Sequence, residues 1–135
     1  MGAKCRNRTT SFGYAASEEE DLDILAAWRD RLRVGGRLVM ELADLEKAIA
    51  VLTADEYTYC EKNGVKGRLI VKDRVLHVDY EYCGKKLSCE TRLYSKDRLQ
   101  RMLVRSGFNN VRSFGGFDLS AKAPTDNLVI IAERA

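Results

Sequence analysis

Residues 32–42, Leu-Arg-Val-Gly-Gly-Arg-Leu-Val-Met-Glu-Leu, join the end of an amphipathic segment to a short apolar run. The pair Gly35-Gly36 predicts that a helix ends there in a left-handed turn, because glycine adopts positive φ without steric cost. The run Arg37–Leu42 is short, apolar and bounded by turn residues, so it predicts a strand buried on both faces, as in a parallel sheet. A helix that leads directly into such a strand is typical of an α/β fold.

Three helices are predicted along the chain, and each has a polar residue at its start. Ser17 begins a capping box, and apolar residues follow it at three- and four-residue spacing. Asp44 and Ser95 are placed to cap the second and third helices. After the third helix, two further apolar runs, 108–114 and 128–132, predict strands that are joined by a long loop.

Residues 55–94 change from helical spacing to alternating β-type runs. In the third run, apolar and aromatic residues alternate with polar ones, which predicts a strand with one covered face and one face in water. Asn63-Gly64 and Cys83-Gly84 are typical of tight turns. The segment therefore predicts an antiparallel insertion built from hairpins. Its runs are Glu56–Cys60, Arg68–Lys72, Val75–Tyr82 and Leu87–Tyr94.

The composition suits one compact domain. The chain has 135 residues, of which 45% are hydrophobic and 32% are charged, enough for a core and a well-solvated surface. We therefore treat residues 1–135 as a single domain and expect residues 1–16 to form an irregular basic tail and loop. A chain of this length does not hold a complete doubly wound sheet together with its helices.

Several classes of protein are disfavoured by the same sequence. The formal net charge is only +3, and Lys and Arg are spread along the chain, which argues against a nucleic-acid partner. No apolar stretch reaches the roughly 18 residues of a membrane-spanning helix, and no signal-peptide pattern opens the chain, so we expect a cytoplasmic protein without a membrane. The four cysteines form no CxxC pair and there is one histidine, so we expect free thiols and no metal site.

Four motifs stand in an order that is known from one family. Residues 32–38 read Leu-x-x-Gly-Gly-x-Leu, the antiparallel insertion follows, Tyr94-Ser95 opens the next helix, and residues 107–108 end it with Gly-Phe. This ordered set resembles the second half of class I S-adenosylmethionine-dependent methyltransferases and covers about residues 9–135. The resemblance implies a partial doubly wound, Rossmann-like sheet with an antiparallel insertion and three main helices.

The resemblance also implies a ligand cleft at the carboxyl edge of the sheet, where open α/β sheets bind ligands. In the family, the loop after the fourth strand lies near the cofactor, and an insertion after the fifth strand commonly forms a lid over the substrate. No catalytic residue is assigned. The implied cofactor-binding residues are Ser11, Phe12, Gly13 and Tyr14, and the implied substrate-binding residues are Glu41, Tyr80, Tyr82 and Tyr94.

Each of these residues also has a plainer interpretation, which the sequence leaves open. Phe12 and Tyr14 can pack against the helix that follows them. Glu41 can be a solvated strand end, and the tyrosines of the insertion can pack the hairpins.

The sequence departs from the family at its beginning. No Gly-x-Gly follows a predicted strand, so the glycine-rich segment that holds S-adenosylmethionine has no counterpart here. The basic run Lys4–Arg8 stands where the family has an apolar strand, and burying it in a parallel sheet would carry a severe desolvation cost. Strand 37–42 would then expose an apolar edge, which invites pairing. We therefore expect a homodimer, or association with a complementing chain that carries the first half.

Three functions follow from these patterns. The first is the substrate side of a methyltransferase that acts on a small molecule and needs a partner for activity. The second is a non-catalytic dimerisation module, and the third is a small-ligand-binding module built on the insertion with its tyrosines. Binding of S-adenosylmethionine or S-adenosylhomocysteine separates the first from the other two.

Overall fold

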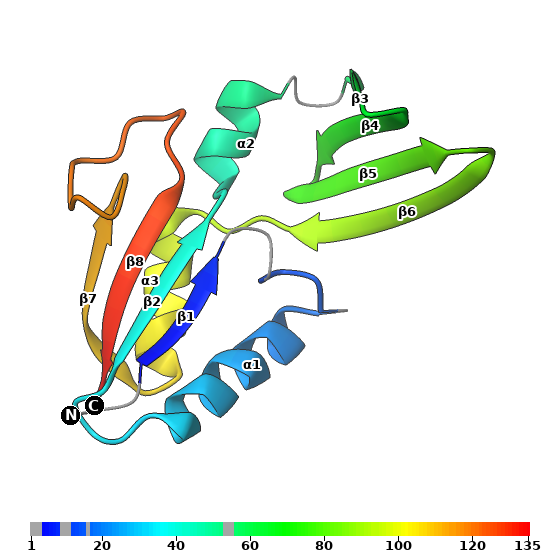
Figure 1. The fold of residues 1–135 in the computed structure, drawn as a ribbon. Coiled ribbons are helices and arrows are strands. Elements are labelled where there is room, and N and C mark those ends of the chain that lie inside the picture. Colours follow the sequence, from blue (N-terminus) through cyan, green and yellow to red (C-terminus); the bar gives the residue numbers. More distant parts are fainter. Residues whose placement is uncertain (1–3, 9–11, 16, 53–55) are drawn as a thin grey trace.

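The computed structural model describes residues 4–8, 12–15, 17–52 and 56–135. Within these residues the chain forms two four-stranded sheets and three helices (Figure 1). The three predicted helices and the antiparallel insertion are therefore present. In chain order the elements are β1 (Lys4–Arg8), α1 (Glu18–Arg31), β2 (Arg37–Leu42), α2 (Leu45–Val51), β3 (Thr58–Lys62), β4 (Val65–Lys72), β5 (Val75–Tyr82), β6 (Lys85–Arg92), α3 (Lys96–Arg105), β7 (Phe108–Phe114) and β8 (Leu128–Arg134).

The caps of the three helices are formed as the sequence predicts. The side chains of Ser17, Asp44 and Ser95 each accept a hydrogen bond from a backbone N–H three residues later, at 3.0–3.2 Å. Helix α1 ends at Arg31, earlier than the glycine pair suggests. Gly35, at φ +79°, forms the turn that follows the helix and leads into β2.

The first sheet has the order β1-β2-β8-β7. β1 runs parallel to β2, whereas β2–β8 and β7–β8 are antiparallel pairs. The two strands predicted near the C-terminus, β7 and β8, are therefore neighbours in the sheet, and β8 pairs directly with β2. The sheet is mixed, with its only parallel pair, among the described strands, at the β1 edge.

The prediction of an irregular basic tail is wrong for Lys4–Arg8, which forms β1. A basic strand carries a severe desolvation cost in the centre of a sheet, but β1 pairs with β2 alone among the described strands. A strand at a sheet edge needs only a backbone ladder on one side, so its residue types are less restricted. The expectation that Arg37–Leu42 has an exposed edge is wrong for the same reason, since β1 occupies that edge.

Helices α1 and α3 pack together on one face of the first sheet. The side chains of Leu38, Met40 and Leu42 in β2 are buried against them, whereas the alternate residues Val39 and Glu41 are only partly buried. The expectation that β2 is buried on both faces is therefore wrong, because the described helices cover one face only. The buried cluster on that face contains Phe12, Leu25, Leu32, Leu38, Met40, Leu42, Tyr94, Leu99, Met102, Leu103, Phe108, Leu128, Ile130 and Ala132.

The second sheet is an antiparallel meander with the order β3-β4-β5-β6. Both residues of each connecting pair have positive φ, at Asn63-Gly64, Asp73-Arg74 and Cys83-Gly84, which is the conformation of tight hairpin turns. The first and third turns confirm the sequence prediction. The second was not singled out, because neither Asp73 nor Arg74 is a glycine.

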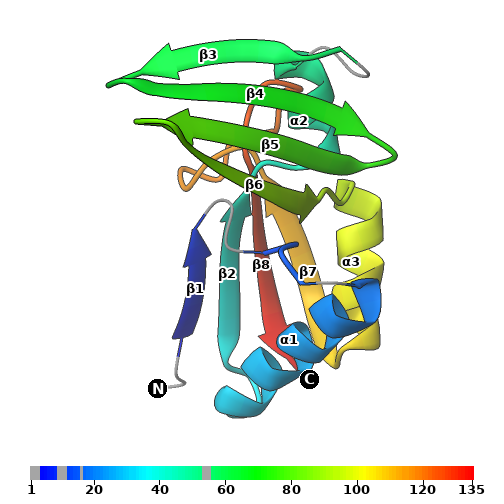
Figure 2. The ribbon, with the colours of Figure 1, turned by 90° about the vertical axis from the view of Figure 1, so that its right-hand side faces the viewer.

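A small separate cluster joins the second sheet to the rest of the molecule. Val71 of β4 and Leu76 of β5 pack against Ala48 of α2 and against Leu93. As Figure 2 shows, the second sheet lies across the carboxyl ends of β1 and β2, with α2 behind it. No helix in the described parts of the chain is long and apolar enough to cross a membrane.

Candidate functional site

The candidate site is the region between the first sheet and the second sheet. Residues 12–15, here called the cofactor loop after the role that the resemblance implies, lie after the carboxyl end of parallel strand β1, the position where open α/β sheets bind ligands. The second sheet lies over the same end of the first sheet (Figure 2). The topology therefore brings the loop and the insertion to one place, as the sequence analysis expects.

Tyr14 belongs to the cofactor loop and Tyr80 to β5 of the second sheet. Their side chains are 50% and 39% exposed, so both remain available to a ligand. Burial raises the pKa of the Tyr80 hydroxyl, and the nearby Cys89, Tyr14 and Cys60 raise it further.

The apolar face of the second sheet continues around Tyr80. A Cβ at Gly67 would lie 2.9 Å from the sulfur of Cys60 and 3.8 Å from a ring carbon of Tyr80, so these two side chains meet over the glycine. The inner face of the second sheet thus presents a phenol and a thiol side by side over the glycine. Such a surface can contact an aromatic or a sugar ring and donate one hydrogen bond from the Tyr80 hydroxyl.

Phe12 and Gly13 fix the shape of the cofactor loop. Phe12 is 2% exposed, and its ring centroid lies 5.9 Å from that of Trp28 and 5.7 Å from that of Tyr94. Gly13 has φ +99°, and a Cβ there would overlap the carbonyl oxygen of Arg92. Phe12 therefore anchors the loop in the core, and Tyr14 is the residue of the loop that reaches solvent. Ser11, also predicted as cofactor-binding, lies outside the described residues.

Tyr94 is buried below the site at 1% exposure, and its hydroxyl donates a short hydrogen bond to Oδ2 of Asp21. Asp21, in α1, is fully buried and also accepts from Nη1 of Arg92 at 2.9 Å. Burial and the Asp21 carboxylate raise the pKa of Tyr94, so its hydroxyl stays protonated and remains a donor. This geometry gives Tyr94 contacts within the protein, which fits the packing interpretation.

Arg92 completes this group. Burial lowers its pKa, but the hydrogen bonds with Asp21 and Tyr94 outweigh that effect and hold the pKa of Arg92 above its ordinary value. The guanidinium is therefore a permanent charge next to a buried carboxylate. The other carboxylate oxygen of Asp21, Oδ1, has no hydrogen-bond partner among the described residues, so the acid depends on these two donors.

Glu41 and Tyr82 are the remaining residues predicted to bind substrate. Glu41 alternates with Met40 and Leu42 in β2, so it lies on the sheet face opposite the one that packs Phe12. Tyr82 is 54% exposed at the end of β5, where its ring lies beside Gly64 of the β3–β4 turn. Of the predicted residues that the structure describes, Phe12 and Tyr94 are in ring contact in the core, whereas Tyr14 and Tyr80 are exposed on the two elements that border the site.

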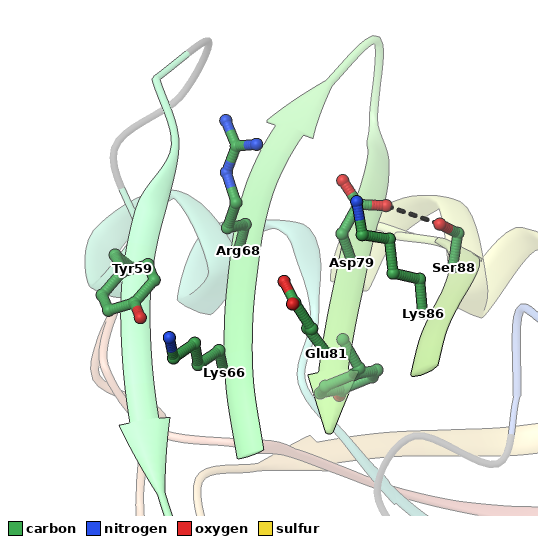
Figure 3. Close-up of a pocket in the computed structure, with 8 residues that line it drawn as sticks. Tyr59, Lys66, Arg68, Asp79, Glu81, Lys86 and Ser88 are labelled. Carbon is green, nitrogen blue, oxygen red and sulfur yellow. Dashed lines mark hydrogen bonds between the residues drawn. The ribbon is translucent and has the colours of Figure 1, made fainter. Parts of the chain in front are cut away.

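The outer face of the second sheet carries a different pocket of about 330 Å³. Neighbouring strands place Arg68 opposite Asp79 and Lys66 opposite Glu81, so the charges alternate across the sheet (Figure 3). Ser88 donates a 2.7 Å hydrogen bond to Asp79. The volume is at the small end for ligand sites. Tyr80 stands between Asp79 and Glu81 in β5 and also borders this pocket, although it pairs with Gly67 of the inner face. The other lining residues are Tyr59, Lys66, Arg68, Asp79, Glu81, Lys86 and Ser88.

The sequence did not predict the contact between the buried Asp21 and the partly buried Arg92. Asp21 lies four residues before Leu25 and eleven before Leu32, on the apolar stripe of α1. A carboxylate on the apolar stripe of a helix indicates a buried residue with a polar partner, so the sequence does contain a signal for Asp21. Arg92 had no such signal, because it stands at the polar end of β6.

Comparison with known proteins finds similarity in structure alone. No protein-family model matches the chain, and no curated protein matches its sequence. The CcbJ methyltransferase from Streptomyces caelestis superposes on 98% of this chain with a TM-score of 0.79 at 13% identity. An S-adenosylmethionine-dependent methyltransferase from Clostridium acetobutylicum also matches 98% of the chain, with a TM-score of 0.77 at 10% identity.

A third solved structure is an amino pentose methyltransferase of calicheamicin biosynthesis from Micromonospora echinaspora, determined with S-adenosylmethionine bound. It matches 96% of the chain with a TM-score of 0.62 at 16% identity. The chain spans only 58–60% of the length of these three structures. At these identities the likeness establishes a partial methyltransferase fold, and both sheets are part of it.

Proposed function

We propose that this chain is the C-terminal, substrate-side part of an S-adenosylmethionine-dependent methyltransferase, acting on a small molecule, with the glycine-rich cofactor turn supplied by a complementing segment. The observation that carries the proposal is the match of 98% of the chain, second sheet included, to 60% of a methyltransferase. A match that included only the first sheet would fit many α/β folds. The second sheet over the cofactor loop is the feature specific to this arrangement.

The residues of this chain suit one side of a cofactor site. Bound S-adenosylmethionine supplies a methyl group on a sulfonium, which a nucleophile of the substrate takes in an in-line displacement. Such a reaction needs mainly alignment of the two reactants and exclusion of water. Tyr14 would lie against the cofactor, and Tyr80 on the inner face of the second sheet would cover the substrate and donate a hydrogen bond from its hydroxyl.

Two open surfaces support a complementing segment. β1 pairs on one side only among the described strands, so its other edge offers backbone donors and acceptors. The sheet face opposite α1 and α3 leaves Val39 and Ile131 partly exposed. A complementing chain, or a second copy of this one, would extend the sheet at β1 and cover that face. Sedimentation velocity at about 50 μM should therefore detect association, and a strict monomer at that concentration contradicts this part of the proposal.

The test of the cofactor assignment uses S-adenosylhomocysteine and NMR spectroscopy of the chain itself. Saturable shift changes are expected at residues 12–15 and at Tyr80, with weak affinity because only one side of the site is present. Thiol labelling gives a second readout, since ligand should slow the labelling of Cys60, whereas Cys83 in the β5–β6 turn serves as the exposed control. Absence of shifts at Tyr14 and Tyr80 up to millimolar ligand contradicts the proposal.

The outer pocket favours a second candidate, a small-ligand-binding module without catalysis. Its alternating charges around Arg68 and Asp79 suit a small molecule with both a cationic and an anionic group. The same titration separates the two candidates. Ligands of this module would shift Arg68, Asp79 and Ser88 and would leave the cofactor loop unchanged.

A further inference from the structure

The cofactor loop is hydrogen-bonded to the second sheet at the end of β6. The backbone N–H of Arg92 donates a 2.8 Å hydrogen bond to the carbonyl of Gly13. The contact is so close that a side chain at Gly13 would overlap the Arg92 carbonyl. Loop and strand are therefore in direct backbone contact, although 79 residues separate them in sequence (92 − 13).

The Arg92 side chain makes a second connection to the same loop. Nη1 donates to the carbonyl of Ala15 at 3.2 Å and to Oδ2 of Asp21 at 2.9 Å. Tyr94 donates to the same carboxylate oxygen. Asp21, Arg92 and Tyr94, here called the latch, thus connect the cofactor loop and α1 to the end of β6.

The segment that carries the latch is also fixed on its other sides. The N–H of Leu93 donates to the carbonyl of Arg74 in the β4–β5 turn at 2.8 Å, and the carbonyl of Tyr94 accepts from the N–H of Leu45 at 3.0 Å. Residues 92–94 are therefore where the second sheet, α2 and the cofactor loop meet. A shift of the second sheet at this point has to move the loop or break these bonds.

We propose that Arg92 is a positioning residue for the cofactor loop. It holds the loop against the base of the second sheet through Asp21 and Ala15, so that the two sides of the cleft keep one spacing. This inference rests on the proposed function, which gives the loop its role beside the cofactor. Tyr94 supports Arg92 indirectly, because it orients the carboxylate that Arg92 binds.

The test is amide hydrogen exchange, measured by NMR on the chain without ligand. Arg92→Lys keeps a positive charge beside Asp21, but its nitrogen ends one bond short of the guanidinium nitrogens, so bonds to the loop are lost. Exchange at the amide of position 92, which is bonded to Gly13, should rise about tenfold. The amides of Leu93 and Arg134 are bonded to Arg74 and Gly36 and should change little.

Two further variants make the result decisive. Tyr94→Phe removes only the hydroxyl and should raise exchange at position 92 by a smaller factor, so it decides the matter if Arg92→Lys does not fold. Arg98→Lys is the matched control, because Arg98 bonds Glu18 between α3 and α1 without touching the loop, and it should leave position 92 unchanged.

A merely structural role for Arg92 would raise exchange at positions 92, 93 and 134 by one common factor, through global unfolding. That result, or no change at position 92, overturns the proposal. Since no ligand enters the measurement, its failure leaves the cofactor titration untouched, and a failed titration leaves the latch untouched.

Discussion

The two sheets of this protein are held together in different ways. In the first sheet, β2 pairs with β8, so that Leu38 lies beside Ala132, and its core draws on α1, β2, α3 and β8. In the second sheet every strand pairs with its neighbour in sequence, and among the described residues of β3–β6 the buried hydrophobic side chains are Val71 and Val78. The first sheet is thus stabilised by burial between distant segments, the second by local turns and a small cluster.

This difference suits the proposed division of roles. Long-range burial makes a scaffold whose parts unfold together, whereas a sheet with few buried contacts opens locally at lower free energy. A cover over a binding cleft has to open for exchange of ligands. The contrast teaches that the contacts joining the two sheets, at α2 and at the latch, decide how independently the second sheet moves.

The largest expected effect is in the core of the first sheet. Leu103→Ala removes a fully buried side chain of α3 and should lower the free energy of unfolding by about 2–5 kcal/mol. Val104→Ala is the matched control, because Val104 is next in the same helix and 61% exposed, and it should change stability by at most about 0.5 kcal/mol. Urea denaturation measures both. Equal losses of stability in the two variants would contradict the burial of Leu103 in the core of the first sheet.

A somewhat smaller effect is expected at the contact between the sheets. Gly13→Ala forces a residue with a Cβ into positive φ and against the Arg92 carbonyl, which should cost about 2–4 kcal/mol. Gly84→Ala has a similar φ, +75°, but its Cβ meets nothing within 4 Å, so it should cost about 1–2 kcal/mol. The difference between the two, from thermal or urea unfolding, isolates the steric contact with Arg92. A zero difference would contradict that close contact.

The next prediction tests whether the second sheet opens by itself. Val78→Ala removes buried methyl groups and should cost the second sheet about 1–2 kcal/mol. Hydrogen exchange should then become faster at the amides of β4, β5 and β6, and remain unchanged at those of β8. Val75→Ala, at a partly exposed position of the same strand, is the control. Equal acceleration in both sheets would show that they unfold as one unit, against the contrast drawn above.

Local signals in the sequence predicted most of the elements. The caps at Ser17, Asp44 and Ser95 and two of the three hairpin turns depend on residues close in sequence, which is why spacing revealed them. The predictions that failed concerned which strands lie beside each other in the first sheet. The residue types of Lys4–Arg8 do not state whether a strand is central or at an edge, and β1 was missed for that reason.

In the candidate site, too, some features follow from the order of the elements and others depend on contacts between distant side chains. The placement of the loop that carries Tyr14 and of the sheet that carries Tyr80 followed from the order of the elements, because strand topology brings a loop after β1 under the insertion. The latch required knowledge of which side chains meet, and the position of Asp21 on the apolar stripe of α1 was the only local sign of it. An ionic contact such as Asp21–Arg92 joins residues of two distant elements. The residue pattern of one element can therefore indicate only one of the two partners.

The smallest expected effect concerns the ion pair between α1 and α3, and it tests whether charge adds to the burial that holds the first sheet. The hydrogen bond from Arg98 holds the pKa of Glu18 below its ordinary value of 4.5. A lowered pKa in the folded state means stability that is present above pH 4.5 and is lost as the pH falls through the folded pKa. The side chains are 35% and 38% exposed, so solvent screening limits the effect to about 0.2–1 kcal/mol.

Glu18→Gln should therefore lower stability slightly at pH 7, and the difference from the unaltered chain should vanish well below pH 4.5. Glu19→Gln is the matched control, since Glu19 shares the first turn of α1 and its dipole and is exposed. Subtracting the control leaves the contribution of Arg98. A pH-independent difference at Glu18, measured by urea denaturation between pH 3 and 7, would contradict an ionic origin. The contact between α1 and α3 would then be stabilised here by burial without a contribution from charge, and the difference in how the two sheets are stabilised would be larger.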